Sequence, residues 1–212
     1  MAIIHRAELR PTKLEMLSDW LPSRPWYPSV REQLASVGAY RFDDPAGDVG
    51  IETLLVSTGD GHVIQMPLTY RHAPLDGAED GLIATMEHSV LGRRWVYDAC
   101  SDPVYLAAIA AAIAGFRAQA DELVEGADGP TAREQTARVT GSGDAVAIPA
   151  GLSVGDLAYA DEGDVTVCRT PSAELRVRHL PVRADGAADG PCLTGTWRGQ
   201  EDPVVLVTAS RV

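Results

Sequence analysis

The chain has 212 residues, of which 45% are hydrophobic, and a formal net charge of −12 at pH 7. That length and that apolar fraction are sufficient for a buried core, so they exclude a wholly disordered chain. The excess of acidic residues excludes nucleic acid and anionic membrane surfaces as partners, because both bind proteins through a basic face.

The N-terminal segment predicts a short strand followed by a capped helix. Ile3–Leu9 is expected to be the strand. Thr12 and Glu15 have the spacing of a capping box, in which the two side chains satisfy backbone amides at the start of a helix. Pro22 ends the predicted helix, because proline lacks the amide hydrogen that a helix interior requires. One helical face carries Leu14, Leu17 and Leu21.

Strands dominate the chain between this helix and the next. Residues 34–42 are expected to form one strand. Residues 51–57 and 62–70 flank the sequence Thr-Gly-Asp-Gly, which is a strong hairpin signal. A second hairpin is predicted from residues 82–90 and 94–98, around Leu91-Gly92-Arg93.

A second helix is predicted to begin at Asp102-Pro103. Aspartate is a preferred N-cap, and proline is favoured at the first helical position. The helix is expected to end within residues 122–126, and its alanines allow it to lie close to a sheet. Its apolar face is expected to hold Leu106, Ile109, Ile113 and Phe116.

The rest of the chain is rich in predicted strands. It follows a linker at Gly126–Pro130 and contains a flexible connection at Ala184–Pro191. Many strands with few helices imply an α+β fold, with a curved, mainly antiparallel sheet packed on one or two helices and a β-rich C-terminal extension. The strands expected in this part are residues 133–140, 165–169, 174–182 and 204–208.

Three blocks that each contain Pro and Tyr stand in a fixed order in the first half of the chain, at Leu14–Tyr27, Gln65–Leu75 and Arg94–Tyr105. Together they resemble the N-terminal cap domain of actinobacterial trehalose and maltose kinases, over about the first 120 residues. The resemblance implies a cystatin-like arrangement, in which a sheet wraps around a helix. It divides the chain into a cap-like domain at residues 1–126 and a β-rich extension at residues 127–212 that packs on the same core.

The parts that a kinase of this type requires have no recognisable counterpart. Phosphoryl transfer to a sugar needs a lysine for the nucleotide phosphates, a catalytic Asp, and an Asn and an Asp for magnesium. Lys13 is the only lysine, and it lies on the first predicted helix. Gly141-Ser-Gly143 precedes no helix signal, so a phosphate loop is not expected. We therefore predict that the chain has no catalytic residues and is not a kinase.

A glucan-branching activity is not expected either, although proteins with this resemblance tend to be labelled in that way. Branching chemistry uses paired carboxylates at strand ends of a barrel that typically needs about 250 residues. This chain is shorter and has a different order of helices and strands. Its candidate acids lie in turns, where carboxylates favour local hydrogen bonds, at Asp43-Asp44, Asp60 and Asp161-Glu162.

No metal site, nucleophile or cofactor is predicted. The five histidines do not cluster; His62 and His72 flank one strand, and ten strand residues span about 33 Å. Cys100, Cys168 and Cys192 are far apart and form no Cys-x-x-Cys, so they fit a reducing cytoplasm. The N-terminus has no signal-peptide pattern, and no apolar run reaches the length of about 20 residues that spans a bilayer. A cytoplasmic location is expected.

Aromatic residues and nearby arginines are the candidate contact residues. Trp20, Trp95 and Tyr97 fit helix and strand patterns and are expected in the core. Trp26 and Tyr27 lie between two prolines in a predicted loop, where exposed aromatic residues usually mean contact with a ligand or partner. The candidate interaction residues are Arg24, Trp26, Tyr27, Arg71 and Arg94.

The resemblance implies a noncatalytic, cap-like protein of α-glucan or trehalose–maltose metabolism. It would regulate or dock onto a kinase or another enzyme of that metabolism, and an oligomer is possible. The alternative is a module that binds a sugar or a glucan. A third reading is an enzyme related to sugar kinases that uses residues dismissed above.

Overall fold

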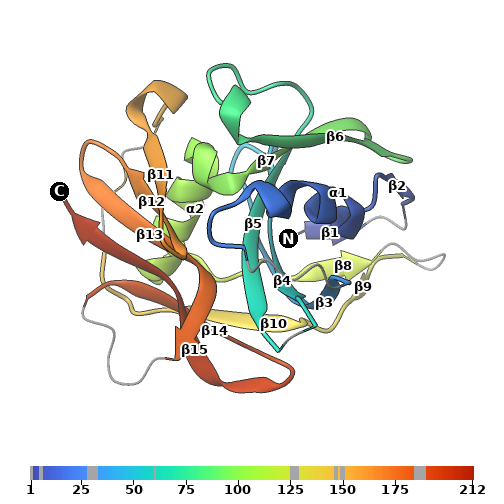
Figure 1. Cartoon of the computed structure of the whole chain (residues 1–212). Coiled ribbons are helices and arrows are strands. Elements are labelled where there is room, and N and C mark those ends of the chain that lie inside the picture. Colours follow the sequence, from blue (N-terminus) through green and yellow to red (C-terminus); the bar gives the residue numbers. More distant parts are fainter. Residues whose placement is uncertain are drawn as a thin grey trace.

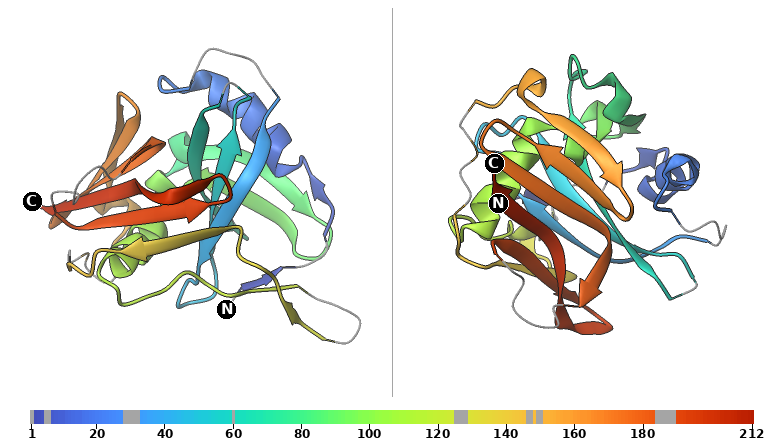
Figure 2. Two further views of the ribbon diagram at one scale, coloured as in Figure 1. Left: turned by 90° about the horizontal axis from the view of Figure 1, so that it is seen from below. Right: turned by 60° about the vertical axis from the view of Figure 1, so that its left-hand side comes forward.

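A computed structural model describes residues 2–4, 7–27, 33–59, 61–124, 129–145, 148, 151–183 and 190–212. This part of the chain is dominated by two six-stranded sheets, with a small third sheet and two α-helices. Figure 1 shows helix α2 between the two large sheets, and Figure 2 shows the same arrangement from two other sides. Parts of the predicted strand at Ile3–Leu9, the linker at Gly126–Pro130 and the connection at Ala184–Pro191 lie outside the described residues, as does Asp60.

The N-terminal sheet has the strand order β2-β6-β7-β5-β4-β3 and is antiparallel throughout. Both predicted hairpins are confirmed, because β4 pairs with β5 and β6 pairs with β7. Its strands are β2 (Leu9–Arg10), β3 (Ala35–Phe42), β4 (Gly50–Ser57), β5 (Val63–Arg71), β6 (Leu82–His88) and β7 (Gly92–Asp98).

Helix α1 (Lys13–Trp20) covers one face of this sheet. Its capping box is present as predicted, since Thr12 accepts from the Glu15 amide and Glu15 accepts from the Thr12 amide. Leu17 and Leu21 are fully buried, and a 3₁₀ turn that contains Pro22 follows the helix. The α1 core, as we call this cluster, joins α1 to apolar residues of β4, β5, β6 and β7.

Helix α2 (Pro103–Ile113) covers the opposite face. Asp102 is its N-cap, as predicted, and accepts from the Val104 amide. The prediction that α2 extends to residues 122–126 is wrong. Gly115 adopts a φ of +73°, and the Phe116 amide donates to the Ala111 carbonyl, which closes the helix. Phe116 is consequently 78% exposed and not part of the apolar face.

The C-terminal sheet has the order β10-β14-β15-β13-β12-β11 and is also antiparallel. The strands predicted at 165–169, 174–182 and 204–208 are present, but β11 and β14 had not been predicted. The strands are β10 (Ala137–Gly141), β11 (Ala158–Glu162), β12 (Val165–Arg169), β13 (Ala173–Arg183), β14 (Cys192–Trp197) and β15 (Gln200–Arg211).

The small sheet brings the N-terminus of the chain beside the segment that follows α2. Strand β1 (Ala2–Ile4) runs parallel to β8 (Glu122–Val124), which pairs antiparallel with β9 (Thr131–Ala132). The strand predicted over residues 133–140 is present only in its second half, as β10, because residues 133–136 form a connection between β9 and β10.

The largest core lies where α2 meets both large sheets. It contains Tyr40 and Leu55 from the N-terminal sheet, Leu106 from α2, and Leu175 and Leu206 from the C-terminal sheet. Gln65 on β5 adds polar contacts across this junction, since its Nε2 donates to the carbonyl oxygens of residues 178 and 206. The two large sheets thus share one core.

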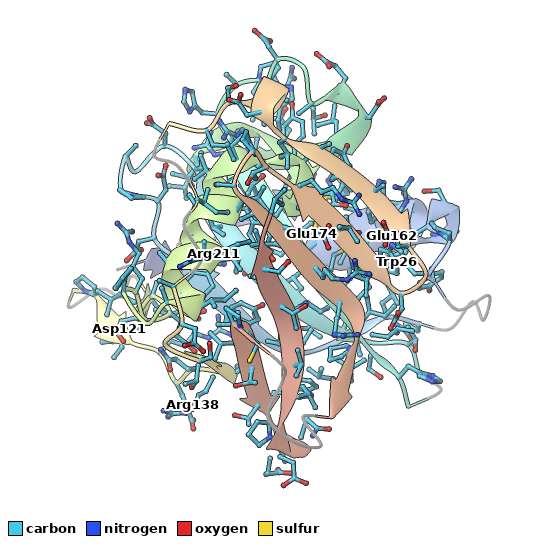
Figure 3. The ribbon with its side chains drawn as sticks, turned by 90° about the vertical axis from the view of Figure 1, so that its left-hand side faces the viewer. Trp26, Asp121, Arg138, Glu162, Glu174 and Arg211 are labelled. Atoms are coloured by element: carbon cyan, nitrogen blue, oxygen red, sulfur yellow. The ribbon has the colours of Figure 1, made fainter. Side chains whose placement is uncertain are left out.

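The outer face of the C-terminal sheet carries an alternating ion network. Arg169 bonds Glu162 and Glu174 at 3.0 Å each, and Arg176 bonds the same two carboxylates at 3.3 and 3.2 Å. Figure 3 shows Glu162 and Glu174 on this face. The four side chains are partly exposed, so the network forms a solvated polar surface.

The predicted curved, antiparallel sheet with helices and a β-rich C-terminal region is confirmed, although strands outweigh helices more than an α+β description suggests. No helix among the described residues is long and apolar enough to cross a membrane.

Candidate functional site

A cavity of about 880 Å³ lies on the α1 side of the N-terminal sheet. Helix α1 has 8 residues and is about 12 Å long, whereas β5 has 9 residues and is about 30 Å long. The helix therefore covers only part of this face. The end that it leaves uncovered forms the cavity, whose volume is in the range of small-molecule sites.

A buried carboxylate, Glu52 on β4, forms the floor of the cavity. It is 3% exposed, and it contacts three neighbours through its two oxygens. Lys13 Nζ lies 2.6 Å from Oε2, and the Tyr70 hydroxyl donates to the same oxygen at 2.8 Å. The Arg41 guanidinium donates to Oε1. Lys13 also lies over the Tyr70 ring, 5.6 Å from its centre.

These partners determine the charge state of Glu52. Burial by itself raises the pKa of this carboxyl, but Lys13 and Arg41, with the Tyr70 hydroxyl, lower it to about 2. Burial and the nearby Glu52 charge raise the pKa of Tyr70 well above its usual value. At neutral pH the floor is thus an ionised carboxylate held by two cations and one neutral hydroxyl. A carboxyl with such a low pKa is unsuited to accept a proton in general acid–base catalysis.

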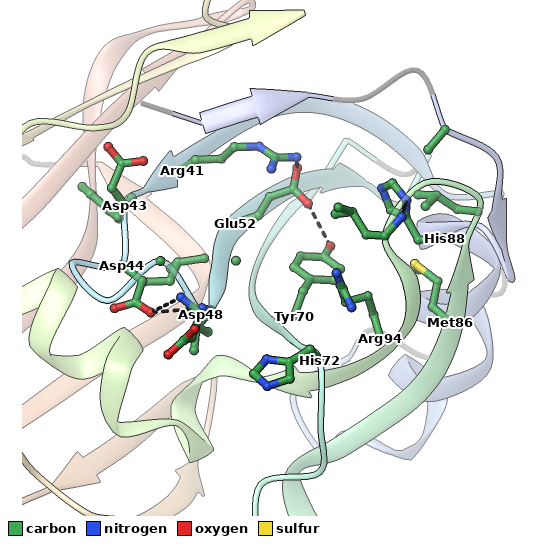
Figure 4. A pocket seen from close by; sticks show the side chains of 18 of the residues that line it. Arg41, Asp43, Asp44, Asp48, Glu52, Tyr70, His72, Met86, His88 and Arg94 are labelled. Carbon is green, nitrogen blue, oxygen red and sulfur yellow. Dashed lines mark hydrogen bonds and ion pairs between the residues drawn. The ribbon is translucent and has the colours of Figure 1, made fainter. Parts of the chain in front are cut away.

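Basic and imidazole side chains line one side of the cavity. Arg94 on β7 is half-buried, and His88 on β6 accepts from the Val90 and Leu91 amides through Nδ1. His72 follows β5 and is exposed. Figure 4 shows Arg94 beside Tyr70, with His72 and His88 on either side.

Acidic side chains from the loop between β3 and β4 line the other side. Asp44 accepts from the amides of Ala46, Asp48 and Val49, and this holds the loop in a fixed turn. In Figure 4, Asp44 and Asp48 lie together on the side of the cavity away from Arg94, and Asp43 lies on the same side but apart from them. The cavity therefore carries basic and acidic side chains on different sides. Among the described residues, no group of three or more His, Cys, Asp or Glu side chains is arranged to hold a metal ion.

The expectation that the aromatic residues of the Pro25–Pro28 segment are exposed is wrong for Trp26. Its side chain is 6% exposed and stacks on the buried His179 ring of β13, with the ring centres 3.7 Å apart. Tyr27 is half-buried and packs against the α1 core. Pro28 itself lies outside the described residues. The aromatic segment thus joins the two sheets instead of presenting a free surface.

The three predicted arginines lie in separate places. Arg24 lies over the Trp20 ring, 4.4 Å from its centre. Arg71 makes two hydrogen bonds of 2.7 and 2.8 Å with Asp102, so it ties the end of β5 to the start of α2. Arg94 is the predicted interaction residue that lines the cavity. Of the residues expected in the core, Tyr97 is buried, whereas Trp20 and Trp95 are half-buried.

Sequence reasoning missed Glu52, Arg41, Tyr70 and the acidic loop as parts of one site. One signal was available: Glu52 interrupts the apolar run of residues 51–56, and a charged residue inside a buried strand needs a partner. Nothing in the sequence indicated that Lys13 is that partner, because the two residues are brought together only by the packing of α1 on the sheet.

A family model identifies the segment that builds most of this site. Residues 20–102 match the maltokinase N-terminal cap domain. The matched cap-like domain begins at the end of α1 and stops at the N-cap of α2, so it contains strands β3 to β7. All residues that line the cavity fall inside it except Ala7, Leu9 and Lys13. A search of curated proteins found no match.

Proposed function

We propose that this protein is a noncatalytic, cap-related protein that docks onto or regulates a kinase or another enzyme of α-glucan or trehalose–maltose metabolism. The observation that carries the proposal is the match of residues 20–102 to the maltokinase N-terminal cap domain. The surrounding structure supports it, because the matched segment supplies five of the six strands of a sheet that is covered on both faces.

The environment of Lys13 supports the noncatalytic part of the proposal. A sugar kinase needs a lysine that is free to hold nucleotide phosphates. Lys13, which is the only lysine, is bound to Glu52 at 2.6 Å and is largely buried. A nucleotide at this lysine would have to break a buried ion pair.

Direct binding to a kinase tests the docking proposal. The purified protein would be titrated into a purified maltokinase from the same organism, and binding would be followed by calorimetry together with maltose phosphorylation. We expect a complex and a changed rate of phosphorylation. The absence of both binding and a rate change, with that kinase and with the other α-glucan enzymes of the host, would contradict the proposal. Phosphorylation of sugar by the protein alone would contradict its noncatalytic part.

The cavity favours a second function, which is binding of a sugar or a short glucan. Sugar hydroxyls both donate and accept hydrogen bonds, and the cavity offers carboxylates, guanidinium groups and the Tyr70 ring. A ligand that binds the native state must raise the melting temperature. We expect such a rise with millimolar maltose, trehalose or maltotriose if this function applies. An unchanged melting temperature with all three sugars would rule it out.

A further inference from the structure

Arg94 lines the cavity without an ion pair to any carboxylate of the described residues. Its only hydrogen bond among the described residues runs from Nη1 to the Arg93 carbonyl at 3.0 Å. The remaining donors of this half-buried guanidinium have no acceptor in the part of the chain that the structure describes, although the chain carries a net charge of −12. A guanidinium presents paired donors that match the two oxygens of a carboxylate.

The neighbouring cations differ from Arg94 in this respect. Lys13 and Arg41 are bound to Glu52, and Arg71 is bound to Asp102. Arg93, which precedes Arg94 on β7, is exposed and pairs with Glu87 at 2.8 Å. Arg94 is therefore placed to bind a carboxylate from outside the protein, whereas these four are engaged within it.

The opposite side of the cavity has the opposite charge. Asp44 and Asp48 lie together there, with Asp43 apart from them on the same side (Figure 4), and the backbone bonds of Asp44 fix the loop that carries them. Three carboxylates at this side repel a second negative group on a ligand and attract a positive one. A dianion such as a sugar phosphate is disfavoured for the same reason.

The space between the two sides is left open by Gly50. This residue is paired with Tyr70 across β4 and β5, and it lines the cavity without a side chain. A Cβ at this position would lie 3.4 Å from the Tyr70 Cβ, in ordinary contact, so a larger residue would extend into the cavity without a clash in the backbone.

We propose that this cavity binds a small zwitterion, with its carboxylate on Arg94 and its ammonium group on the Asp43, Asp44 and Asp48 side. The inference does not depend on the docking function proposed above. It also differs from the sugar-binding alternative, because a neutral sugar carries neither of the two charges that the cavity separates.

A set of small molecules that share a six-carbon chain and differ in their end groups tests the proposal. The full-length protein would be titrated with 6-aminohexanoate, hexanoate and hexylamine, and 4-aminobutyrate and glycine would vary the distance between the charges. Calorimetry and the melting temperature are the readouts. We expect at least one amino acid of the series to bind, about tenfold or more tightly than hexanoate and hexylamine, since each end group adds a charge-assisted contact.

Matched variants locate the site. Arg94→Gln should weaken binding of that zwitterion about tenfold or more, while Arg93→Gln, on the adjacent exposed residue, should leave it unchanged. Asp48→Asn should reduce the preference for the zwitterion over hexanoate. Gly50→Val should abolish binding by filling the cavity, and circular dichroism would show that each variant is folded.

Several results would overturn the proposal. Equal binding of hexanoate and the zwitterions would show that the acidic side does not take part. Loss of binding in Arg93→Gln as well as in Arg94→Gln would show that general surface charge is responsible. Binding of none of the amino acids, whether or not maltose or trehalose binds, would also overturn it.

Discussion

A single buried carboxylate, Glu52, explains why two distant cations and one tyrosine meet at the floor of the cavity. Burial of an unpaired charge costs several kcal/mol, so a strand that carries such a residue must bring partners to it. Lys13 comes from α1, Arg41 from β3 and Tyr70 from β5. The cluster therefore ties the helix to three strands of the sheet, β3, β4 and β5, as well as shaping the cavity.

Glu52→Gln is expected to destabilise the protein by about 2–3 kcal/mol, because Lys13 and Arg41 would lose their charged partner in a partly buried site. Urea unfolding measures the change. The matched control is Glu87→Gln, which breaks the exposed pair with Arg93 and should cost less than about 1 kcal/mol. Equal losses in the two variants would show that the burial of Glu52 is unimportant.

His179 is the other residue whose burial has a measurable consequence. Its ring stacks on Trp26, and its nitrogens lie 2.7 Å from Thr166 Oγ1 and 3.2 Å from the Gln65 carbonyl oxygen. Burial lowers the pKa of His179 to about 4, although the Gln65 carbonyl and nearby aspartates oppose this effect. The unfolded chain, with an ordinary histidine pKa of about 6.5, therefore binds a proton at a higher pH than the folded protein does.

The contribution of neutral His179 to the free energy of unfolding should be fully present above pH 6.5. It should fall as the pH decreases toward about 4. His179→Phe keeps an aromatic ring against Trp26 but cannot titrate. We expect the free energy of unfolding of the wild type, relative to this variant, to decrease by about 3 kcal/mol across that interval. Urea unfolding at several pH values measures the difference. A difference that does not change with pH would contradict the assignment.

At the scale of elements, the edge strand β10 is protected by one side chain. Gln119, which follows α2, accepts from the Val139 amide at 2.7 Å and donates to the Ala137 carbonyl at 2.9 Å. An unprotected edge can pair with another chain, so such a side chain both stabilises the strand and limits aggregation. The early end of α2 at Ile113 is what allows Gln119 to reach β10.

Gln119→Ala is expected to cost about 1–3 kcal/mol, because two hydrogen bonds to the strand are lost. Hydrogen exchange should be faster at the Val139 amide, and light scattering should show more association. Gln200→Ala serves as the control, since Gln200 bonds only the carbonyl two residues away and is not needed at a sheet edge. Unchanged exchange at Val139 would show that Gln119 does not protect the edge.

At the scale of the whole molecule, the family match and the core have different boundaries. The matched cap-like domain ends at Asp102, whereas the core around α2 continues into β12, β13, β14 and β15. The Trp26–His179 stack and the Gln65 hydrogen bonds cross the same junction. The C-terminal sheet therefore completes the core that the cap-like segment begins.

A fragment of residues 1–126 is expected not to fold cooperatively, because α2 would expose the face that packs on the C-terminal sheet. Near-ultraviolet circular dichroism and urea unfolding of the fragment, compared with the full chain, test this. A cooperative transition in the fragment would show that residues 1–126 are an independent domain and would support a boundary at residue 126.

Local signals in the sequence were sufficient for much of the fold. The capping box at Thr12, the N-cap at Asp102 and the two hairpins depend on residues close together in the chain, and all are present. The three blocks that contain Pro and Tyr were likewise sufficient for the cap resemblance, which the family match supports. The end of α2 was not predictable from the apolar spacing, because that spacing continues to Phe116 beyond Gly115, where the left-handed backbone ends the helix.

The sequence by itself thus determined that the fold is rich in strands and that part of the chain resembles the cap domain. The first follows from patterns within a few residues, and the second follows from motifs that can be recognised in the sequence. Only the tertiary structure decided that Trp26 is buried, that Lys13 neutralises Glu52 and that Arg94 faces an acidic loop across a cavity. These facts depend on how α1 and the C-terminal sheet pack on the strands. The residues involved can be far apart in the chain, since Trp26 and His179 are separated by 153 positions. Packing between distant segments leaves no local pattern, so it was not predictable from the sequence.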